Sequence, residues 1–506
     1  MSQTNASSTV NLIPRPAKCR LTGHDLRLSL PVPVYAPSMP EISPVLQTFI
    51  EESAPPDGVL LTLIGQAAAS DNKPGLTISI QSDMQAPEAY DLVIGPGSAR
   101  LTASSPAGML YGLHTFLQLC RIDGSEVLVI GAEIADQPRF AWRGMHLDVS
   151  RHFFPVSFIK IYIDLLARHK MNMFHWHLCD DQGWRIEIPA FPRLTEVGAW
   201  RIEDGNRYGG FYSRSDIADI VEFARKRCVT IVPEIEMPGH AMSALTAYPE
   251  YSCTGGPFTV PTTWGVFDDV YCAGNEKTFA FLEAILSDVA SLFPGPMIHI
   301  GGDECPKERW RAHDLCQQRM QQEGLGDEDQ LQSYFIRRIA KYLNTIGKRL
   351  VGWDEILDGG APAGSTIMAW RSAEKGIEAA RAGHDVVMCP MTHCYFDHYQ
   401  ADPAGEPKAI GGFSPLDKVY AFEPIPDGLP AELQDRIVGA QANVWTEYMP
   451  DSDHVEYMTF PRLCALAEVL WSPRSMRLWD NFAARLRSHI KRLDKIGVKY
   501  RRSDIS

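Results

Sequence analysis

The segment RGMHLDVSRHFFPVSFIKIYIDLLARHKMNMFHWHL (143–178) sets the pattern for most of the chain. It opens with a short apolar run (143–149), continues with apolar residues at helical spacing (156–170), and closes with a second apolar run (172–178). Short apolar runs on either side of an amphipathic stretch indicate a strand, a crossover helix and a second, parallel strand. We therefore predict one β-α-β unit here.

The same alternation continues toward the C-terminus. Further strand-like runs lie at 229–235, 297–302, 349–353, 366–370, 385–390 and 438–445. Further helical runs lie at 215–227, where Ser215 is the expected N-cap, at 276–293 and at 328–347. About eight such units predict an α/β fold, a (β/α)8 TIM barrel catalytic domain spanning 139–506. The interval 353–366 is too short for a full crossover helix, so we expect a degenerate unit there.

The first 138 residues have a different pattern of apolar and polar residues. They combine short alternating runs with two helical patterns, at 42–53 and 105–120. The alternating runs are LLTLIG (60–65), LTISIQ (76–81) and YDLVIG (90–95). This mixture predicts a smaller α+β domain with an antiparallel sheet at 1–138. We find no chemistry in this region and expect a non-catalytic packing domain.

Composition excludes several classes of partner. The 506 residues carry 48 basic and 62 acidic side chains, a formal net charge of −14, which argues against nucleic acid and against an anionic membrane surface. No apolar run approaches the length of a membrane span. The N-terminus lacks the charged start and apolar stretch of a signal peptide, so the chain as given is expected to be cytoplasmic, or periplasmic or secreted if a leader was removed. Oligomeric state stays open between monomer and homodimer.

Eleven cysteines are scattered along the chain without a CxxC pair. A disulfide scaffold is not expected in a chain this large. Cys253 and Cys272 flank a loop rich in Gly, Pro and Thr, and they are able to pair in an oxidising compartment. The sequence leaves open whether they do.

Charged and aromatic residues recur just after the strand-like runs. In chain order they are Asp148, Arg151 and His152; Asp180, Asp181 and Trp184; Glu234, Glu236 and His240; Asp303 and Glu304; Trp353, Asp354 and Glu355; Trp370 and Arg371; Tyr395 and Asp397; and Trp445 and Glu447. TIM-barrel active sites form at this end of the strands. Carboxylates bind hydroxyl groups and indole rings stack on C–H surfaces, so the set suits an uncharged sugar.

The motif HIGGDE (299–304) is the sharpest chemical signal. Adjacent side chains of a regular strand point to opposite faces, so Asp303 and Glu304 can share a pocket only where the strand breaks, as Gly301 and Gly302 permit. Glycoside cleavage needs a protonated carboxyl near the leaving oxygen and a second group that stabilises the cationic sugar carbon. The pair therefore predicts a glycosidase.

Together with DxSRHF, HWHLxDDQGWR, PEIEMPGH, GWDEIL and a late WTE, this motif makes the chain resemble glycoside hydrolase family 20, the β-N-acetylhexosaminidases. The resemblance covers essentially the whole chain. It implies an exo-acting, retaining enzyme that removes terminal β-linked GlcNAc or GalNAc from glycans without a metal or other cofactor. The substrate's own acetamido oxygen would be the nucleophile and would form an oxazolinium intermediate.

The resemblance also implies roles for individual residues. Glu304 would be the general acid and base, and Asp303 would orient the acetamido group. The other implied substrate contacts are Arg151 at the 3- and 4-hydroxyls, Asp180 and His240 as a polar dyad beside Glu304, Trp353, Trp370 and Trp445 around the acetamido group and under the ring, Tyr395 at the acetamido carbonyl, and Asp397 and Glu447 at the 4- and 6-hydroxyls.

Three alternatives compete with this interpretation. A metal-dependent barrel hydrolase would use His175 and His177, whose spacing places both on one face of a strand; packing inside the barrel is the competing role for this pair. A nucleotide cyclase is suggested by GGDE, but Cys305 follows instead of Phe and the next residues have a helical pattern. A non-catalytic sugar-binding barrel would require loss of the acid pair, and both acids are present.

Overall fold

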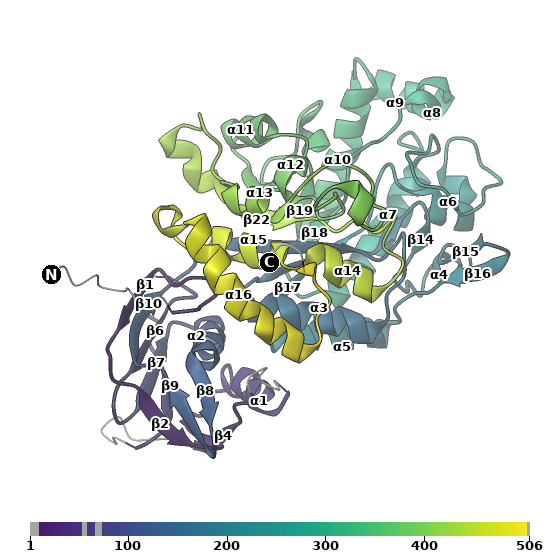
Figure 1. Ribbon diagram of the computed structural model, residues 1–506. Helices are drawn as coiled ribbons and strands as arrows, with labels where there is room; N and C mark the ends of the chain where they lie inside the picture. The colour runs from purple at the N-terminus through teal and green to yellow at the C-terminus, as the bar shows by residue number, and fades with distance from the viewer. Residues whose placement is uncertain (1–9, 53–57, 66–72, 85, 503–506) are drawn as a thin grey trace.

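The computed structural model describes residues 10–52, 58–65, 73–84 and 86–502, and it places a barrel beside a smaller N-terminal domain (Figure 1). The first nine residues, on which the expectation of no leader depends, lie outside this part of the chain. Among the described residues, no helix combines the length and apolar character needed to cross a bilayer.

Eight parallel strands close into a barrel in sequence order, which confirms the predicted TIM barrel. They are β11 (Trp142–Asp148), β12 (Met173–His177), β17 (Thr230–Glu234), β18 (Met297–His299), β19 (Arg349–Trp353), β20 (Thr366–Ala369), β21 (Asp385–Met388) and β22 (Ile437–Ala442). Their side chains are almost all buried, as expected for a parallel sheet covered on both faces. The apolar runs were visible in the sequence for the same reason.

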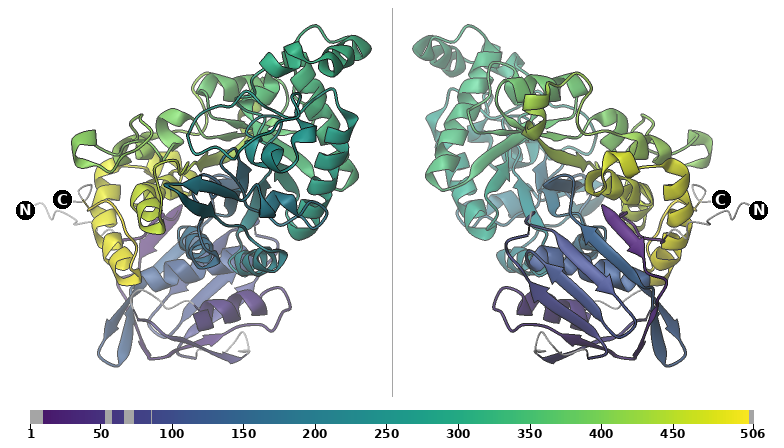
Figure 2. Two further views of the ribbon diagram at one scale, coloured as in Figure 1. Left: turned by 90° about the vertical axis from the view of Figure 1, so that its right-hand side faces the viewer. Right: turned by 90° about the vertical axis from the view of Figure 1, so that its left-hand side faces the viewer.

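Helices cover the outside of the barrel (Figures 1 and 2). The longer ones are α3 (Val156–Arg168), α5 (Arg214–Arg225), α7 (Glu276–Leu292), α10 (Glu328–Thr345), α11 (Ala373–Arg381), α14 (Ser452–Thr459), α15 (Arg462–Trp471) and α16 (Trp479–Ile496). Further helices lie in the connecting loops: α4 (Arg193–Glu196), α6 (Met242–Ala247), α8 (Glu308–Ala312), α9 (Asp314–Glu323), α12 (Met391–Cys394) and α13 (Leu416–Ala421). Between β19 and β20 there is only the 3-10 turn η2 (Asp354–Leu357), the expected degenerate unit.

The predicted N-cap of α5 was wrong by two residues. Ser213, not Ser215, caps the helix: its hydroxyl accepts from the Asp216 backbone N–H at 3.2 Å, and the Asp216 carboxylate accepts from the Ser213 N–H at 2.9 Å. This reciprocal capping box satisfies two otherwise unpaired donors. Ser215 lacks such a partner at its third following residue.

The N-terminal domain contains a seven-stranded sheet in the order β1-β10-β6-β7-β5-β3-β4. The bounds are β1 (Lys18–Leu21), β3 (Val32–Tyr35), β4 (Leu61–Gly65), β5 (Leu76–Ile80), β6 (Tyr90–Ile94), β7 (Ala99–Ala103) and β10 (Ala132–Asp136). The pairs from β1 to β7 are antiparallel, as expected, and the remaining pairs are parallel. A second, antiparallel sheet holds β2 (Leu26–Ser29), β9 (Glu126–Val129) and β8 (Cys120–Asp123).

Two helices complete this domain, α1 (Ser43–Glu52) and α2 (Pro106–Leu119). Helix α2 packs on β6 and β7 and also contacts the barrel helix α3, so it lies between the sheet and the barrel. The sheet of this domain faces the viewer in the right-hand view of Figure 2 and lies behind helices in the left-hand view.

A buried polar cluster joins the two domains. The Trp471 indole, at the end of α15, packs in the core of the N-terminal domain and donates a hydrogen bond to Asp136 Oδ1 at 2.9 Å. Lys170 Nζ lies 3.0 Å from Asp136 Oδ2 and 4.3 Å from the centroid of the Trp471 ring, with both charged side chains fully buried. Moving one domain against the other would part the charges of Lys170 and Asp136, and a buried charge without its partner is strongly unfavourable. The cluster therefore holds the domains in one relative position.

Candidate active site

All eleven residues predicted for the site line one cavity of about 330 Å³ at the carboxyl end of the barrel strands. They are Arg151, Asp180, His240, Asp303, Glu304, Trp353, Trp370, Tyr395, Asp397, Trp445 and Glu447. Each follows or ends one of the eight strands, so the closure of the barrel brings together side chains that are up to about 300 residues apart in sequence. Their individual roles remain predictions.

The acid pair lies where β18 breaks. The strand ends at His299, and Gly301 and Gly302 follow with φ values of 66° and 92°. A β-carbon at Gly301 would collide with the Glu236 carboxylate, so glycine is required both for its conformation and for the close approach. Glu304 itself has a φ of 40°, an uncommon value for a residue with a side chain. This local geometry lets both acids line the cavity.

Asp303 has the electrostatics of a functional carboxyl. Its burial raises its pKa to about 7, with further contributions from the negative charges of Glu234 and Glu304 and against the opposing effect of His240. Its Oδ1 atom is buried and has no hydrogen-bond partner among the described residues. Buried carboxylate oxygens are normally hydrogen-bonded, so this atom is available for a donor on a ligand.

His240 links the acids to a charged network. Its Nδ1 atom lies 3.1 Å from Asp180 Oδ1, and its Nε2 atom lies 3.5 Å from Glu304 Oε2 and 3.6 Å from Asp303 Oδ2. Burial alone would lower the pKa of His240, but the Asp180 carboxylate and its hydrogen bond raise it well above the usual value. With Asp181 Oδ2 also 3.3 Å from its Nδ1 atom, His240 lies among four carboxyl groups, which favour its protonated form.

Glu304 is the more open member of the pair, with a side chain that is 46% exposed. The neighbouring His240 lowers the pKa of Glu304 in the free protein, against the opposing effect of partial burial. A sugar that covers this carboxyl would remove water from it, and desolvation raises the pKa of an acid. Binding of substrate therefore shifts Glu304 toward the protonated form that a general acid needs.

Arg151 is held in place by three side chains. Its guanidinium lies 3.1 Å from Asp148 Oδ2 and 2.9 Å from Asp180 Oδ2, and its Nε donates to Gln182 Oε1 at 3.1 Å. The guanidinium carbon also lies 5.1 Å from the centroid of the Trp445 ring. The side chain is thus fixed at the wall of the cavity before any ligand arrives.

Aromatic rings form the other wall. Trp370 and Tyr395 stack at 6.0 Å between centroids, with 26° between their planes. Trp353 and Trp445 lie 5.9 Å apart. The indole of Trp353 donates to Glu234 at 3.0 Å in a buried hydrogen bond, and that of Trp370 donates to Glu355 at 2.9 Å in a partly buried one, so both rings are fixed by hydrogen bonds.

Two more carboxylates leave oxygens available at the cavity. Asp397 Oδ1 and Glu447 Oε2 are buried and have no hydrogen-bond partner in the part of the chain that the structure describes. Burial raises the pKa of both groups, most strongly that of Asp397. Unpaired buried acceptors are costly, and hydroxyl groups of a bound sugar would satisfy them.

The histidine pair of the HWH motif lies below the cavity, inside the barrel. His177 contacts the Glu234 carboxylate through Nδ1 and Asp180 Oδ2 through Nε2 at 2.7 Å, while His175 Nε2 lies 3.0 Å from Glu234 Oε2. Burial opposes the charge on His177, but Glu234 and Asp180 raise its pKa to about 10. Both rings are fully buried, and they hold groups that face the site.

Sequence reasoning missed part of the cavity wall. Five further lining residues come from the segment that follows β21: Met391, His398, Ile410, Gly411 and Gly412. Most of this segment is irregular, and no apolar periodicity or charged motif distinguishes it in the sequence. Glu355, just after the end of β19, does not line the cavity but accepts a hydrogen bond from the Trp370 indole at 2.9 Å. Burial and the nearby Asp303 raise its pKa to about 8.

Comparison with known proteins places this site in a family. Residues 140–474 match the catalytic domain of glycosyl hydrolase family 20, and residues 9–137 match domain 2 of the same family. The chain therefore belongs to glycosyl hydrolase family 20. The comparisons give no support to the alternative of a metal-dependent barrel hydrolase.

Relatives and solved structures agree with the family. The chain is 49% identical over 422 residues to a β-hexosaminidase of Porphyromonas gingivalis, covering 82% of this chain and 54% of that protein. A Vibrio furnissii β-hexosaminidase is 39% identical over 75% of this chain and 64% of its own length. The structure of an exo-β-N-acetylglucosaminidase of Vibrio harveyi in complex with N-acetylglucosamine superposes with a TM-score of 0.87 at 32% identity, covering 97% of this chain and 78% of that one. The chain thus spans about half to two-thirds of the length of these two relatives.

Proposed function

We propose that this protein is an exo-acting, retaining β-N-acetylhexosaminidase that releases terminal β-linked GlcNAc or GalNAc by substrate-assisted catalysis. The observation that carries the proposal is the cavity itself, in which an Asp-Glu pair, an arginine, four aromatic rings and unpaired carboxylate oxygens converge. These groups match the hydroxyls, the acetamido group and the C–H faces of one N-acetylated sugar. The P. gingivalis and V. furnissii β-hexosaminidases support the same activity.

The closed floor and the small size of the cavity support the proposed exo action. The interior of the barrel beneath it is filled by Glu234, His175, His177 and His299, all fully buried. These side chains close the cavity on the barrel side, and its volume of about 330 Å³ suits a single terminal sugar better than the middle of a long glycan. The non-reducing sugar would occupy the cavity and the rest of the glycan would extend to solvent past the exposed Glu304.

The reaction proceeds in two steps. In the first, Glu304 gives its proton to the glycosidic oxygen, the C1–O bond breaks, and the acetamido oxygen bonds to C1 while Asp303 accepts the acetamido N–H. In the second, Glu304 takes a proton from water as the water oxygen bonds to C1 and the C1–acetamido bond breaks. Two inversions at C1 give net retention. The protein supplies proton transfer, positioning and charge stabilisation.

We also propose the chain division expected from the sequence, with a non-catalytic domain at 1–138 and the catalytic barrel at 139–506. The two separate hydrophobic clusters of the described residues support it. Both Asp303 and Glu304 belong to the barrel.

A panel of chromogenic substrates tests the activity. We expect hydrolysis of aryl β-GlcNAc and β-GalNAc, and turnover of the aryl β-glucoside that is at least roughly 10³-fold slower because it lacks the intramolecular nucleophile. Initial rates measured side by side give the ratio. Comparable turnover of the β-glucoside would contradict the substrate-assisted mechanism, and inactivity on all three sugars would contradict the proposed function.

The substitution Arg151→Lys tests the hydroxyl contacts. Lysine keeps the charge but cannot present two parallel donors, so we expect kcat/KM to fall by about 10–100-fold, the loss of charged hydrogen bonds worth roughly 1.5–3 kcal/mol. Arg185→Lys is the matched control, because Arg185 is buried and its hydrogen bonds among the described residues go to backbone carbonyls outside the cavity. The control should lower Tm and leave KM unchanged. Unchanged kinetics with a lowered Tm for Arg151→Lys would assign Arg151 a structural role alone.

A further inference from the structure

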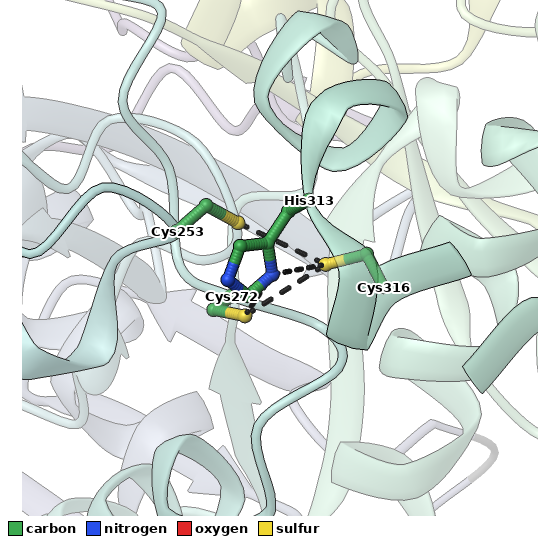
Figure 3. A group of neighbouring side chains, drawn as sticks. All are labelled: Cys253, Cys272, His313 and Cys316. Atoms are coloured by element: carbon green, nitrogen blue, oxygen red, sulfur yellow. Dashed lines mark hydrogen bonds between the residues drawn. The ribbon is translucent and has the colours of Figure 1, made fainter. Parts of the chain in front are cut away.

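A second group of side chains, separate from the cavity, has the composition of a metal site. Cys253, Cys272, His313 and Cys316 converge with their sulfur and nitrogen atoms all within 4.8 Å of one another (Figure 3). Cys272 and Cys316 are fully buried, and all three cysteines are free thiols in the structure. None of the four residues lines the active-site cavity.

The distances match tetrahedral coordination. Cys316 Sγ lies 3.8 Å from Cys253 Sγ and 3.7 Å from Cys272 Sγ. The His313 Nδ1 atom lies 3.5 Å from Cys272 Sγ and 3.6 Å from Cys316 Sγ. Zn–S bonds of about 2.3 Å and Zn–N bonds of about 2.0–2.1 Å at tetrahedral angles give edges of about 3.8 Å between sulfurs and about 3.6 Å between sulfur and nitrogen. The four atoms therefore surround a space of the size that Zn²⁺ requires.

A disulfide does not explain this arrangement. Two bonded sulfurs lie about 2.05 Å apart, whereas Cys253, Cys272 and Cys316 are all free thiols in the structure, and Cys316 Sγ lies 3.7 Å or more from the other two sulfurs. Pairing of Cys253 with Cys272, which the sequence left open, would also leave Cys316 and His313 facing the bridge without a function. Three thiols and an imidazole nitrogen are instead a common ligand set of structural zinc sites, in which four protein ligands leave no position for substrate.

The backbone is built to bring the ligands together. Cys253 and Cys272 lie at the two ends of the loop 254–271, where the Cys272 N–H donates to the Tyr251 carbonyl at 2.8 Å. His313 and Cys316 are three residues apart at the start of α9, so they share one side of its first turn. Gly274 lets the two segments touch, because a β-carbon there would overlap the backbone of Leu315 and Cys316.

We propose that Cys253, Cys272, His313 and Cys316 form a structural Zn²⁺ site that ties together the loops following β17 and β18. Binding would displace the protons of the three thiols and leave a complex with a net charge of −1. The two joined loops are those that carry His240 on one side and Asp303 and Glu304 on the other. The site goes beyond the proposed glycosidase activity, because the metal would touch neither the sugar nor the acid pair.

The tethered loop also reaches the sugar-binding wall. The Thr263 carbonyl accepts a hydrogen bond from Gln182 Nε2 at 2.8 Å, and Gln182 Oε1 accepts one from Arg151 at 3.1 Å. The Trp264 ring lies 5.7 Å from that of His152. Fixing the ends of the 254–271 loop would therefore limit motion at the Arg151 side of the cavity.

Metal analysis of the full-length protein tests the proposal. The chain is produced in zinc-containing medium, purified under reducing conditions without a metal-affinity column, and measured by plasma mass spectrometry. We expect close to one zinc per chain. Cys316→Ser and Cys272→Ser should reduce this to below roughly a tenth and lower Tm, whereas Cys228→Ser, a half-buried cysteine outside the cluster, should retain it.

Two measurements on the wild-type chain test the proposed zinc site even if the variants do not fold. Zinc-edge X-ray absorption should show three sulfur and one nitrogen neighbour, and exchange with Co²⁺ should give the visible bands of tetrahedral cobalt with thiolate charge transfer. A reduced wild-type chain that holds no zinc and takes none up would overturn the proposal, as would a Cys253–Cys272 disulfide in peptide mapping. Chitobiose hydrolysis, assayed separately, reports on the proposed function.

Discussion

Glu304→Gln should reduce kcat/KM for an N-acetylglucosamine disaccharide by about 10²–10⁴-fold, the usual contribution of general acid catalysis. Glutamine keeps the shape of the side chain but cannot protonate the glycosidic oxygen. The loss should be much smaller for an aryl glycoside whose leaving group departs without a proton. The comparison of the two substrates therefore separates a lost proton donor from a damaged site.

Glu308→Gln serves as the control for this substitution. Glu308 lies four residues further along the chain, at the start of α8, and outside the cavity. It should keep wild-type kinetics on both substrates. Near-normal hydrolysis of the disaccharide by Glu304→Gln would show that another group donates the proton, and equal losses on both substrates would point to disturbed binding.

Asp303→Asn should lower kcat by roughly 10²–10³-fold, the scale of losing one preorganised electrostatic contact to a transition state. The buried Oδ1 atom of Asp303 has no partner among the described residues, so it is free to accept the acetamido N–H and to stabilise the positive charge of the oxazolinium. A thiazoline analogue of that intermediate should bind the wild type tightly and the variant poorly. Inhibition constants measured with both proteins give the comparison, and Asp435→Asn, on the exposed surface, is the control.

The covalent alternative makes the opposite prediction for the same residue. If Asp303 attacked C1 itself, a 2-fluoro glycoside would leave a sugar on the protein. Intact-mass measurement after incubation should show no adduct. A stable glycosyl ester on Asp303 would refute the substrate-assisted mechanism while leaving the glycosidase activity in place.

Most of the barrel could be predicted because its strands are buried on both faces. Runs such as 349–353 are short and mostly apolar, and charged or aromatic residues follow at their C-terminal ends. This change in residue type marks the end of each strand in the sequence. The site residues could be predicted from the same strand ends, because a parallel barrel brings the C-terminal ends of its strands together. The error at the α5 cap has a local cause: Ser213 and Ser215 both precede the helix, and only the position of Asp216 decides between them.

Other features depend on contacts that no local pattern records. The wall from 391 to 412 takes its place by packing against the barrel, and the lining glycines there are indistinguishable in sequence from those of other loops. The Cys/His cluster could not be predicted from the sequence, because its four residues come from two different loops. They also lack the paired CxxC spacing by which many zinc sites are recognised. The three-residue spacing of His313 and Cys316 was the one local sign of it.

The position of Trp471 has a consequence for how the chain is made. Asp136 leaves the ribosome 335 residues before the indole that it binds. At roughly 5–20 residues per second, the nascent N-terminal domain waits on the order of 20–70 s for the last aromatic ring of its core. The part that is synthesised first is therefore among the last to be completed.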